Sequence, residues 1–349
     1  MNQPSKSLAS LQALRAVAAL AVFLFHLVPY FEVAGANLFP KQIFRWGYAG
    51  VDIFFVLSGF VLTLSATSAP RHDPQVATKF LALRMWRIYS GYWPFLIAMC
   101  LVNLYFGFGR ALDDNILGSI FLTDIRLDKL VLGVSWTLTY ELYFYALFST
   151  LFLLPRVYSR VAAGAFAGAI LAFRPMYPDS AGSLALGFIF SPYVLEFFLG
   201  VLLAKCWLGG RIPIRRPFLW LIFLASFYSG SALLKIKPDD ELGRLLTFGV
   251  GSGALLLVLL NTKLFEATVL GRGLVRLGDA SYTLYLSHLI FIDTIHELGF
   301  FALLGQQGST LANLGAITFI TAVCLFSIAF YRLYEKPSYL WLKGRLQGL

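Results

Sequence analysis

The sequence is poor in charged residues, which make up 13% of its 349 positions, whereas 58% are hydrophobic. A soluble domain covers its core with ionic and polar groups, so this ratio excludes a conventional cytosolic enzyme. It also excludes a disordered chain, a collagen and a small disulfide-bonded scaffold, because none of these classes combines such high apolarity with so little charge. The composition therefore indicates an integral membrane protein, whose solvent is the lipid bilayer.

Cysteine is also scarce. The three cysteines, Cys100, Cys206 and Cys324, lie far apart, and two of them fall inside apolar runs. This distribution matches neither the CxxC spacing of a metal knuckle nor a disulfide framework. We expect structural roles for all three cysteines and no bound metal.

Apolar stretches long enough to cross a bilayer, at about 20 residues per crossing, recur along the whole chain. They lie at residues 11–30, 48–67, 88–108, 134–154, 160–174, 184–205, 217–234, 245–262, 282–304 and 311–333. The stretch at 160–174 is short for a crossing, so we expect about nine to eleven transmembrane helices, with ten as the central value. The predicted fold class is all-α and polytopic.

No loop is long enough to hold a soluble domain. The longest loops, near residues 31–47, 109–133 and 263–281, mix Gly, Pro and polar residues with aromatics. They resemble neither low-complexity linkers nor repeat units. We therefore expect a single integral-membrane domain over residues 1–349, with no appended soluble domain.

The basic residues predict the orientation of the chain. If the N-terminus is cytosolic, 17 Lys and Arg residues fall in inside segments, 9 fall in outside segments, and Arg15 and Arg332 lie within helices. The positive-inside rule then places both termini in the cytoplasm. The net charge of +10 is explained by this topology, so we expect no nucleic-acid partner. Because Arg15 interrupts the first apolar stretch, we expect that helix to be retained and not cleaved as a signal peptide.

Ionisable side chains inside the apolar stretches are the candidates for function, because a charge in hydrocarbon is costly and usually faces a cavity. Arg15 and His26 are eleven residues apart, which places them on nearly the same helical face, about 16 Å apart along the axis. The two residues are therefore predicted to line one wall. The alternative is that Arg15 extends to the membrane surface while His26 makes a hydrogen bond between helices.

Three further ionisable residues are candidates. Arg84 and Arg87 are three residues apart on one helix, so their planar donor groups are suited to hold a phosphate. The alternative for this pair is ordinary anchoring beside anionic lipid. Glu141 lies seven residues into the fourth apolar stretch, one turn before Tyr145. A carboxylate at that depth needs a partner, and it either pairs with an arginine or orients a catalytic histidine.

Six separated motifs carry a resemblance to a known family. They are Arg15-x10-His26, GVDIFFVLSGFVLTLS at 50–65, RMWRIY at 84–89, SWTLTYELYFY at 135–145, SYTLYLSH at 281–288 and YEKP at 334–337. In order and spacing these motifs resemble the membrane-bound acyltransferase family 3, over residues 11 to about 337. Each motif is weak alone, and it is their succession that is specific.

The resemblance implies a multi-pass enzyme of the bacterial cytoplasmic membrane that transfers an acyl group, usually acetyl, from cytosolic acyl-CoA to a hydroxyl of a saccharide or lipid-linked glycan. Acyl-CoA is then the donor substrate, and no permanently bound cofactor is expected. His26 matches the essential histidine, as a general base or a nucleophile, and Glu141 matches a glutamate that would orient it. Arg84 and Arg87 match the pair associated with the CoA donor, and Arg15 is the first member of the Arg-x10-His pattern.

Other motif residues have supporting roles in this interpretation. Asp52 and Ser58 of the second motif are expected to give polar support to the first helix. Trp136 belongs to the WxLxxE pattern that contains Glu141. Tyr285 falls on one face with a second tyrosine and a histidine, one helical turn apart.

For that face, formed by Tyr282, Tyr285 and His288, an aromatic stripe at the membrane interface is favoured over a cavity lining. Glu335 is expected to be structural, because Pro337 should end the last helix. His72 is expected to be an ordinary loop residue.

The chain departs from the family pattern at one place. Where the family commonly has a proline two or three residues after the second arginine, this chain has Ser90 and Gly91, with Pro94 further on. The basic pair itself is intact, so we expect the local helix geometry to differ and the activity to persist.

Two other functional classes fit parts of the pattern. A proton-coupled transporter would also have ten spans and buried His, Glu and Asp residues, but it typically shows inverted repeats, which we do not detect. A non-catalytic partner in an envelope assembly gives no reason for the set Arg15, His26, Arg84 and Arg87. Acceptor-dependent transfer of label from acetyl-CoA would distinguish the enzyme from both alternatives.

Overall fold

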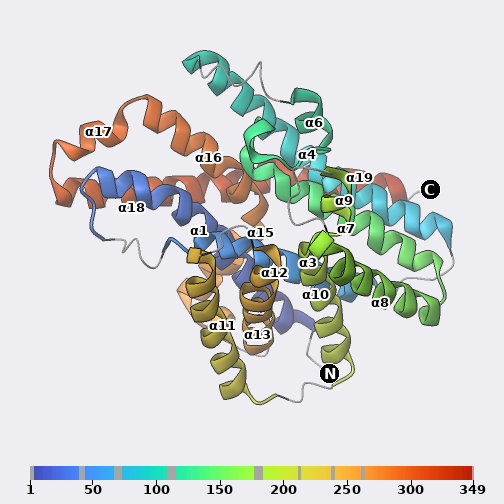
Figure 1. The fold of residues 1–349 in the computed structure, drawn as a ribbon. Helices are drawn as coiled ribbons and strands as arrows, with labels where there is room; N and C mark the ends of the chain where they lie inside the picture. The colour runs from blue at the N-terminus through green and yellow to red at the C-terminus, as the bar shows by residue number, and fades with distance from the viewer. Residues whose placement is uncertain are drawn as a thin grey trace. The chain divides into compact units, whose positions relative to one another are not determined.

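The regular elements are all helical in the computed structural model, which describes residues 4–38, 44–66, 73–107, 115–176, 184–210, 214–236, 240–260 and 264–347 (Figure 1). The principal α-helices are α1 (Pro4–Val33), α3 (Gly50–Ala66), α4 (Pro74–Phe106), α7 (Trp136–Leu153), α8 (Arg156–Phe173), α10 (Tyr193–Leu208), α11 (Arg216–Ile236), α13 (Val250–Leu259), α16 (Ser281–Glu297) and α18 (Ser309–Phe330). Each predicted apolar stretch overlaps one of these helices. The all-α fold class is therefore confirmed.

Seven helical segments of the described residues are long and apolar enough to cross a membrane. They contain α1, α3, α4, α10, α11, α13 and α18. Helix α8 is apolar but shorter, and α16 has 17 residues. The chain is thus a multi-pass membrane protein, while the number of crossings near ten and the cytoplasmic placement of both termini stay predictions.

Part of the charge pattern lies outside the described residues. The residues concerned are Lys41, Arg71, His72, Arg110, Arg211, Lys237 and Lys263. The loop role predicted for His72 is among these and stays a prediction.

Shorter helices connect the long ones. The α-helical pieces are α6 (Ile116–Phe121), α9 (Leu184–Ile189), α12 (Glu241–Arg244), α14 (Leu264–Ala267), α15 (Val269–Asp279), α17 (Phe300–Gly305) and α19 (Lys336–Gln347). Single turns of 3-10 helix are η1 (Gly47–Ala49), η2 (Leu127–Lys129), η3 (Gly133–Ser135) and η4 (Arg174–Met176), and the π-helical segments are η5 (Leu245–Gly249) and η6 (Tyr331–Glu335).

Helix α15 corrects one prediction, because the segment 263–281 was expected to be a loop. The hydroxyl oxygen of Thr268 accepts a hydrogen bond from the Gly271 N–H at 3.0 Å and caps the first turn of the helix. Only one side of α15 is buried, through residues such as Leu277 and Gly278. A short amphipathic helix of this kind has too few apolar residues to register as a span.

The end of the last apolar stretch is also different from the prediction. Pro337 was expected to stop the helix, but it is the second residue of α19, which follows α18 through the π-helical segment Tyr331–Glu335. The helical segment runs without a break from Ser309 to Leu346, and Pro337 follows directly on the π-helical turn, where the regular hydrogen-bond pattern of the α-helix is already interrupted. The helix thus continues where it was expected to end.

The chain divides into two compact units. Unit 1 contains Met1–Val51, Trp86–Thr139 and Thr262–Leu349, and unit 2 contains Asp52–Met85 and Tyr140–Asn261. The expectation of one domain over residues 1–349 stays a prediction.

In unit 1, glycines allow neighbouring elements to approach α1 closely. A side chain at Gly278 of α15 would overlap the Gln12 backbone of α1, and one at Gly47 of η1 would overlap the Ala21 carbonyl. Small residues at helix contacts let backbones come together, which is how helices associate in lipid. Helix α1 is therefore held on two sides.

In unit 2, α3 and α10 make a reciprocal glycine contact. Gly59 of α3 lies against the Phe197 carbonyl of α10, and Gly200 of α10 lies against the Val56 carbonyl of α3. A Cβ atom at either glycine would collide with backbone, which cannot move aside as a side chain can. These two helices can pack at this distance only because both positions lack a side chain.

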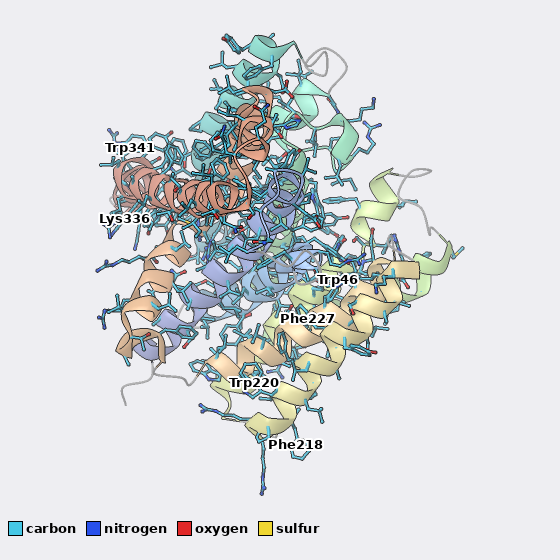
Figure 2. All side chains as sticks on the ribbon, turned by 90° about the vertical axis from the view of Figure 1, so that its left-hand side faces the viewer. Trp46, Phe218, Trp220, Phe227, Lys336 and Trp341 are labelled. Carbon is cyan, nitrogen blue, oxygen red and sulfur yellow. The ribbon has the colours of Figure 1, made fainter. Side chains whose placement is uncertain are left out.

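Helices α11 and α13 form a second contact in unit 2. Leu219, Ala254 and Val258 are buried together at this contact. Phe218 and Trp220, on either side of Leu219, are 59% and 43% exposed (Figure 2). This alternation is what a helix shows when one face packs on protein and another faces the membrane.

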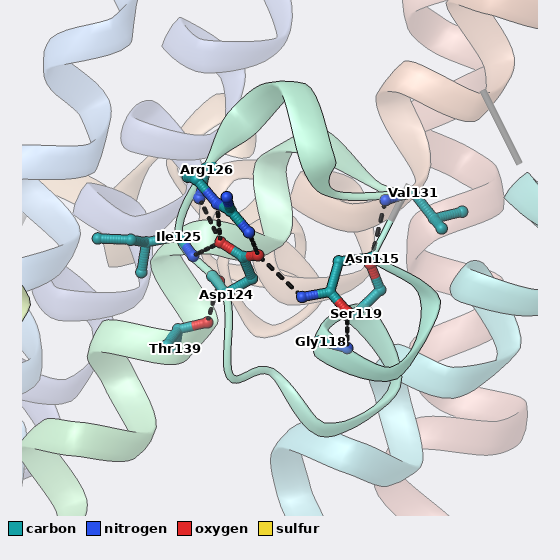
Figure 3. A network of polar contacts seen from close by, with 8 residues as sticks. All are labelled: Asn115, Gly118, Ser119, Asp124, Ile125, Arg126, Val131 and Thr139. Carbon is teal, nitrogen blue, oxygen red and sulfur yellow. Dashed lines mark hydrogen bonds and ion pairs between the residues drawn. The ribbon is translucent and has the colours of Figure 1, made fainter. Parts of the chain in front are cut away.

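The loop between α6 and α7, in unit 1, is closed by the carboxylate of Asp124 (Figure 3). Arg126 donates to it from Nη2 at 2.6 Å and from Nε at 3.0 Å, Asn115 donates at 2.9 Å, and the Ile125 N–H donates at 2.8 Å. The hydrogen bonds from Arg126 and, to a smaller extent, from Asn115 hold the pKa of Asp124 well below its usual range, against the opposing effect of burial. The Thr139 hydroxyl donates to the Asp124 carbonyl at 3.1 Å and so connects the loop to α7.

Three aromatic side chains of α4 hold α6 in place within unit 1. The Tyr92 and Tyr89 hydroxyls donate to the carbonyls of Ser119 and Phe121, both at 2.8 Å. The Trp93 indole N–H donates to the Ile120 carbonyl, which lies between these two in sequence, at 3.2 Å. Helix α6 is thus fixed to α4, and the loop that follows α6 is fixed to α7 through Thr139.

Candidate functional site

His26 and His288 meet where α1 packs on α16, inside unit 1. The Nδ1 atom of His26 lies 3.0 Å from the Val22 carbonyl oxygen and 3.2 Å from Nε2 of His288. The Nδ1 atom of His288 lies 3.3 Å from the Leu284 carbonyl oxygen. His288 is fully buried, whereas His26 is half-buried.

Arg15 of α1 also contacts α16, at the first residue of that helix. Its Nε donates to the Ser281 hydroxyl at 3.1 Å. Ser281 and His288 are seven residues apart on α16, so they lie on one face of that helix. Arg15 and His26 therefore both face α16, and His26 makes the hydrogen bond between helices that was the alternative considered for it. That the two residues line the wall of a cavity stays a prediction.

The aromatic stripe predicted at the membrane interface is wrong. Tyr282, Tyr285 and His288 are 8%, 6% and 0% exposed. The Tyr282 hydroxyl donates to the Ile88 carbonyl at 2.7 Å, and the Tyr285 hydroxyl to the Val134 carbonyl at 3.2 Å. Buried tyrosines satisfy their hydroxyl groups in this way, so this face of α16 packs on protein.

The position where the chain departs from the family pattern has a structural role. The ring of Tyr282 occupies the space that a Cβ atom at Gly91 would need. Helix α4 continues through this point and through Pro94 as far as Phe106. The glycine therefore makes room for the tyrosine of another motif.

Helix α4 starts earlier than predicted, at Pro74, so Arg84 and Arg87 lie well inside it and not at its entry. Arg84, in unit 2, donates to the Ser65 hydroxyl at 3.3 Å, and its guanidinium lies 5.7 Å from the Tyr145 ring centroid. The Tyr145 hydroxyl donates to the Glu141 carboxylate. Glu141 thus has a hydrogen-bond partner in Tyr145, and Arg84 and Glu141 contact the same tyrosine. Whether Glu141 also pairs with an arginine or orients a histidine stays a prediction.

Arg87, in unit 1, belongs to a different group of residues. Its positive charge and that of Arg15 both act on the carboxylate of Glu335. Glu335 is buried, and the Thr283 hydroxyl donates to it at 2.8 Å. The glutamate of the YEKP motif, expected to be only structural, thus lies at the meeting point of two candidate donor-binding arginines.

Further charged residues of unit 1 interact with Asp279 and with Glu335. Burial raises the pKa of Asp279, at the end of α15, while the positive charges of Arg15, Lys336 and Arg332 oppose that rise. The charged residues of this part of unit 1 are Arg15, Arg87, Arg332, Lys336, Asp279 and Glu335. We call this set the cationic cluster, because its cations outnumber its carboxylates, which suits it to bind an anion.

Asp52 has a partner that the sequence did not predict. Its carboxylate accepts from Arg244 at 2.6 Å, and the Arg244 guanidinium lies 5.4 Å from the Tyr193 ring centroid. Glu196, also fully buried in unit 2, has no hydrogen-bond partner for either carboxyl oxygen among the described residues. Ser58 is half-buried, and the structure assigns it no role.

The predicted site residues are thus found in two groups. Unit 1 holds His26, Arg15, Arg87, Trp136 and Tyr285, and unit 2 holds Glu141, Arg84, Asp52 and Ser58. Unit 1 brings together two groups that spacing alone does not connect, namely His26 with His288 and Arg87 with Glu335. Within the part of the chain that the structure describes, no three His, Cys, Asp or Glu side chains are placed to hold a metal ion.

Comparisons with known proteins agree with the six motifs. A family model described as an acyltransferase domain, of the acyltransferase 3 type, matches residues 8–332. The chain is 32% identical over 310 residues to the exopolysaccharide production protein ExoZ of Rhizobium meliloti (strain 1021), covering 84% of this chain and 90% of that protein. It is 26% identical over 309 residues to ORF330 of Acidianus two-tailed virus, provisionally named an acetyltransferase, covering 82% and 84% of the two chains. No solved structure matches the chain.

Proposed function

Because the chain belongs to acyltransferase family 3 and is an acyltransferase, we propose that it moves an acetyl group from cytosolic acetyl-CoA to a hydroxyl of an envelope or secreted polysaccharide. The relation to an exopolysaccharide production protein supports a saccharide acceptor. The relation to a viral protein named as an acetyltransferase supports acetyl as the acyl group. A lipid-linked glycan is an acceptor of the same chemistry.

One observation carries the proposal: the half-buried His26 shares a helix face with Arg15, and Arg15 is part of the cationic cluster. CoA carries several phosphate charges that cannot enter hydrocarbon, while its thioester is at the end of a long thin arm. The phosphates would bind the cluster through Arg15 and Arg87, with Arg84 nearby in sequence. The arm would then run about 16 Å along α1 to His26.

His26 then supplies the reactive lone pair. As a general base it takes the proton of the acceptor hydroxyl while that oxygen attacks the thioester carbonyl. The new C–O bond forms, the C–S bond breaks, and the proton passes to the CoA sulfur. As a nucleophile, His26 would first accept the acyl group from CoA and then pass it to the hydroxyl.

The roles of Glu141 and Trp136 belong to the same proposal. Glu141, matched by its motif to a glutamate of the family, accepts a hydrogen bond from Tyr145, whose ring lies beside Arg84 within unit 2. Its catalytic role is carried by the motif alone. Trp136 begins α7, and its neighbour Thr137 is hydrogen-bonded to Tyr285 at 3.1 Å. That contact would fix the start of the helix that carries Glu141.

The test measures label transfer from radiolabelled acetyl-CoA to a candidate glycan by the purified protein in lipid nanodiscs. We expect His26→Ala to lower the turnover by at least about 100-fold, because a base or nucleophile of this kind contributes 10² or more. His296→Ala is the matched control, since it removes an exposed histidine of α16. Full acceptor-dependent transfer by His26→Ala would refute the proposal.

Omitting the acceptor separates the two chemical routes. A nucleophilic His26 would retain label on the protein after brief exposure to acetyl-CoA, and the label would then move to added glycan. A general base would leave the protein unlabelled under the same conditions.

A further inference from the structure

The contacts of the two histidines determine where their protons lie. A carbonyl oxygen only accepts hydrogen bonds, so a ring nitrogen that bonds to one must carry a proton. Nδ1 of His26 faces the Val22 carbonyl, and Nδ1 of His288 faces the Leu284 carbonyl. Each neutral ring has one proton, so both rings have it on Nδ1.

The contact between the rings follows from this assignment. With its proton on Nδ1, His288 has a lone pair on Nε2, and that atom lies 3.2 Å from Nδ1 of His26. The His26 proton is then shared between the Val22 carbonyl and the His288 nitrogen. Among the described residues no hydrogen bond engages Nε2 of His26, which is left with its lone pair.

We propose that His288 is a positioning residue for catalysis: its Nε2 accepts the Nδ1 proton of His26 and thereby holds the His26 Nε2 lone pair toward the substrates. The inference rests on the proposed function, in which His26 is the base or nucleophile. Both routes use the same nitrogen, so His288 serves either one. When that nitrogen gains a proton or an acyl group, the ring becomes cationic, and its remaining N–H bond to His288 strengthens.

The surroundings of the two histidines exclude a carboxylate from this position. Aromatic rings enclose His288, with the centroids of Phe23 and Tyr285 each 5.9 Å from its own. Within the described residues, no Asp or Glu hydrogen-bonds to either imidazole. The position that a carboxylate occupies in a Ser-His-Asp triad is held here by a neutral imidazole and a backbone carbonyl.

The charged and titratable groups nearest along the two helices lie beyond the pair at either end. Arg15 is about three turns away toward the start of α1. Toward the other end of α1, Tyr30 contacts the His296 ring at 5.0 Å and interacts with Asp293 and Glu297.

The direct test is the protonation pattern of the rings. The chain has four histidines, so isotope-labelled histidine gives few signals, and single substitutions assign them. We expect solid-state NMR of the bilayer-embedded protein at neutral pH to show His26 with a proton on Nδ1 and none on Nε2. A His26 ring protonated on Nε2 alone would overturn the proposal.

The kinetic test compares two substitutions at His288. His288→Leu removes the acceptor and fills similar space, and we expect kcat to fall about 10-fold to 100-fold with KM for acetyl-CoA unchanged. His288→Gln offers a side-chain oxygen to the same proton, so we expect it to recover most of that loss. Equal losses in the two variants, or full activity in His288→Leu, would overturn the proposal.

Two controls separate this inference from its premise. If His26→Ala is fully active, the proposed function fails; if only His288→Leu is fully active, the inference alone fails. If His288→Leu does not fold, the NMR pattern of wild type and of His288→Gln still decides, because both are expected to keep the His26 proton on Nδ1. A His26 ring protonated on Nε2 alone in wild type or in His288→Gln would overturn the proposal.

Discussion

Arg84 and Arg87 are three residues apart on α4, yet their side chains have different surroundings. Arg84 lies over aromatic rings and beside a serine hydroxyl, whereas the charge of Arg87 acts on the buried Glu335. A guanidinium over aromatic rings keeps its charge while losing part of its hydration. The two arginines are therefore not equivalent, although they share one helix.

We predict that Arg87→Ala raises KM for acetyl-CoA about 10-fold to 100-fold, because a hydrogen bond to a charged group contributes about 1.5–3 kcal/mol. Chemistry at His26 should continue, so kcat should change little. Steady-state kinetics of acetyl transfer measure both quantities. Arg276→Ala, which removes an exposed arginine of α15, is the control, and an unchanged KM in Arg87→Ala would refute the assignment.

At the residue scale, the sequence predicted which residues share a helix face, and it offered a hydrogen bond between helices for His26 without identifying the partner. Eleven residues between Arg15 and His26, and one turn between Glu141 and Tyr145, fix a common face through the helical period alone. His26 and His288 are 262 residues apart, so no spacing rule connects them. Burial of His288 was the missing information, because the SYTLYLSH pattern equally fits a face exposed to lipid.

Among the helices, α3 and α10 pack closely because glycine stands at two positions of their contact. Gly59 and Gly200 each lie against the backbone of the other helix, so the contact is decided by two absent side chains. Without a hydrophobic driving force between helices in lipid, such close backbone approach supplies the packing energy.

We predict that Gly59→Ala destabilises the protein by about 3 kcal/mol, at the upper end of overpacking costs, because the added methyl group meets backbone. Gly168→Ala is the matched control, since a Cβ there meets nothing within 4 Å on the helix α8. That control should be neutral or slightly stabilising, because alanine favours helix over glycine. Thermal unfolding in one detergent compares the two variants, and equal midpoints would contradict the prediction.

Helix positions were predictable because each crossing needs a long apolar stretch, and every such stretch formed a helix. The helical segments that were not predicted are those without a long apolar stretch. Helix α15 is amphipathic, and the first turns of α4, from Pro74, are too polar to be recognised as a span. The π-helical segments Leu245–Gly249 and Tyr331–Glu335 depend on tertiary contacts that local sequence does not reveal.

For the whole molecule, orientation in the membrane decides which groups meet which solution. The charge pattern predicts cytoplasmic termini, which would place the cationic cluster at the cytoplasmic side, where acyl-CoA is available. The same orientation would expose the loop of Asp124 to the outer solution. Acid outside the cell would then reach this loop directly.

We predict that this loop withstands moderate acid. The folded pKa of Asp124 lies below its unfolded value near 3.9, so its contribution to stability is complete above about pH 4 and is lost only as the pH falls further. Corrected hydrogen exchange of residues 122–139 should therefore be equal at pH 7 and pH 5. Asp124→Asn should accelerate this exchange at both pH values, and acceleration of wild type at pH 5 would contradict the prediction.

Helix α19 has a consequence for the whole molecule through a single tryptophan of α4. Trp86, next to Arg87, donates its indole N–H to the Ser338 carbonyl at 3.2 Å, and its ring lies 5.8 Å from that of Trp341. The arginine-bearing turn of α4 cannot slide along its axis without separating these two indoles. If Arg87 binds the donor phosphates as proposed, its position depends on a residue 252 positions beyond Trp86 in the chain as well as on α4.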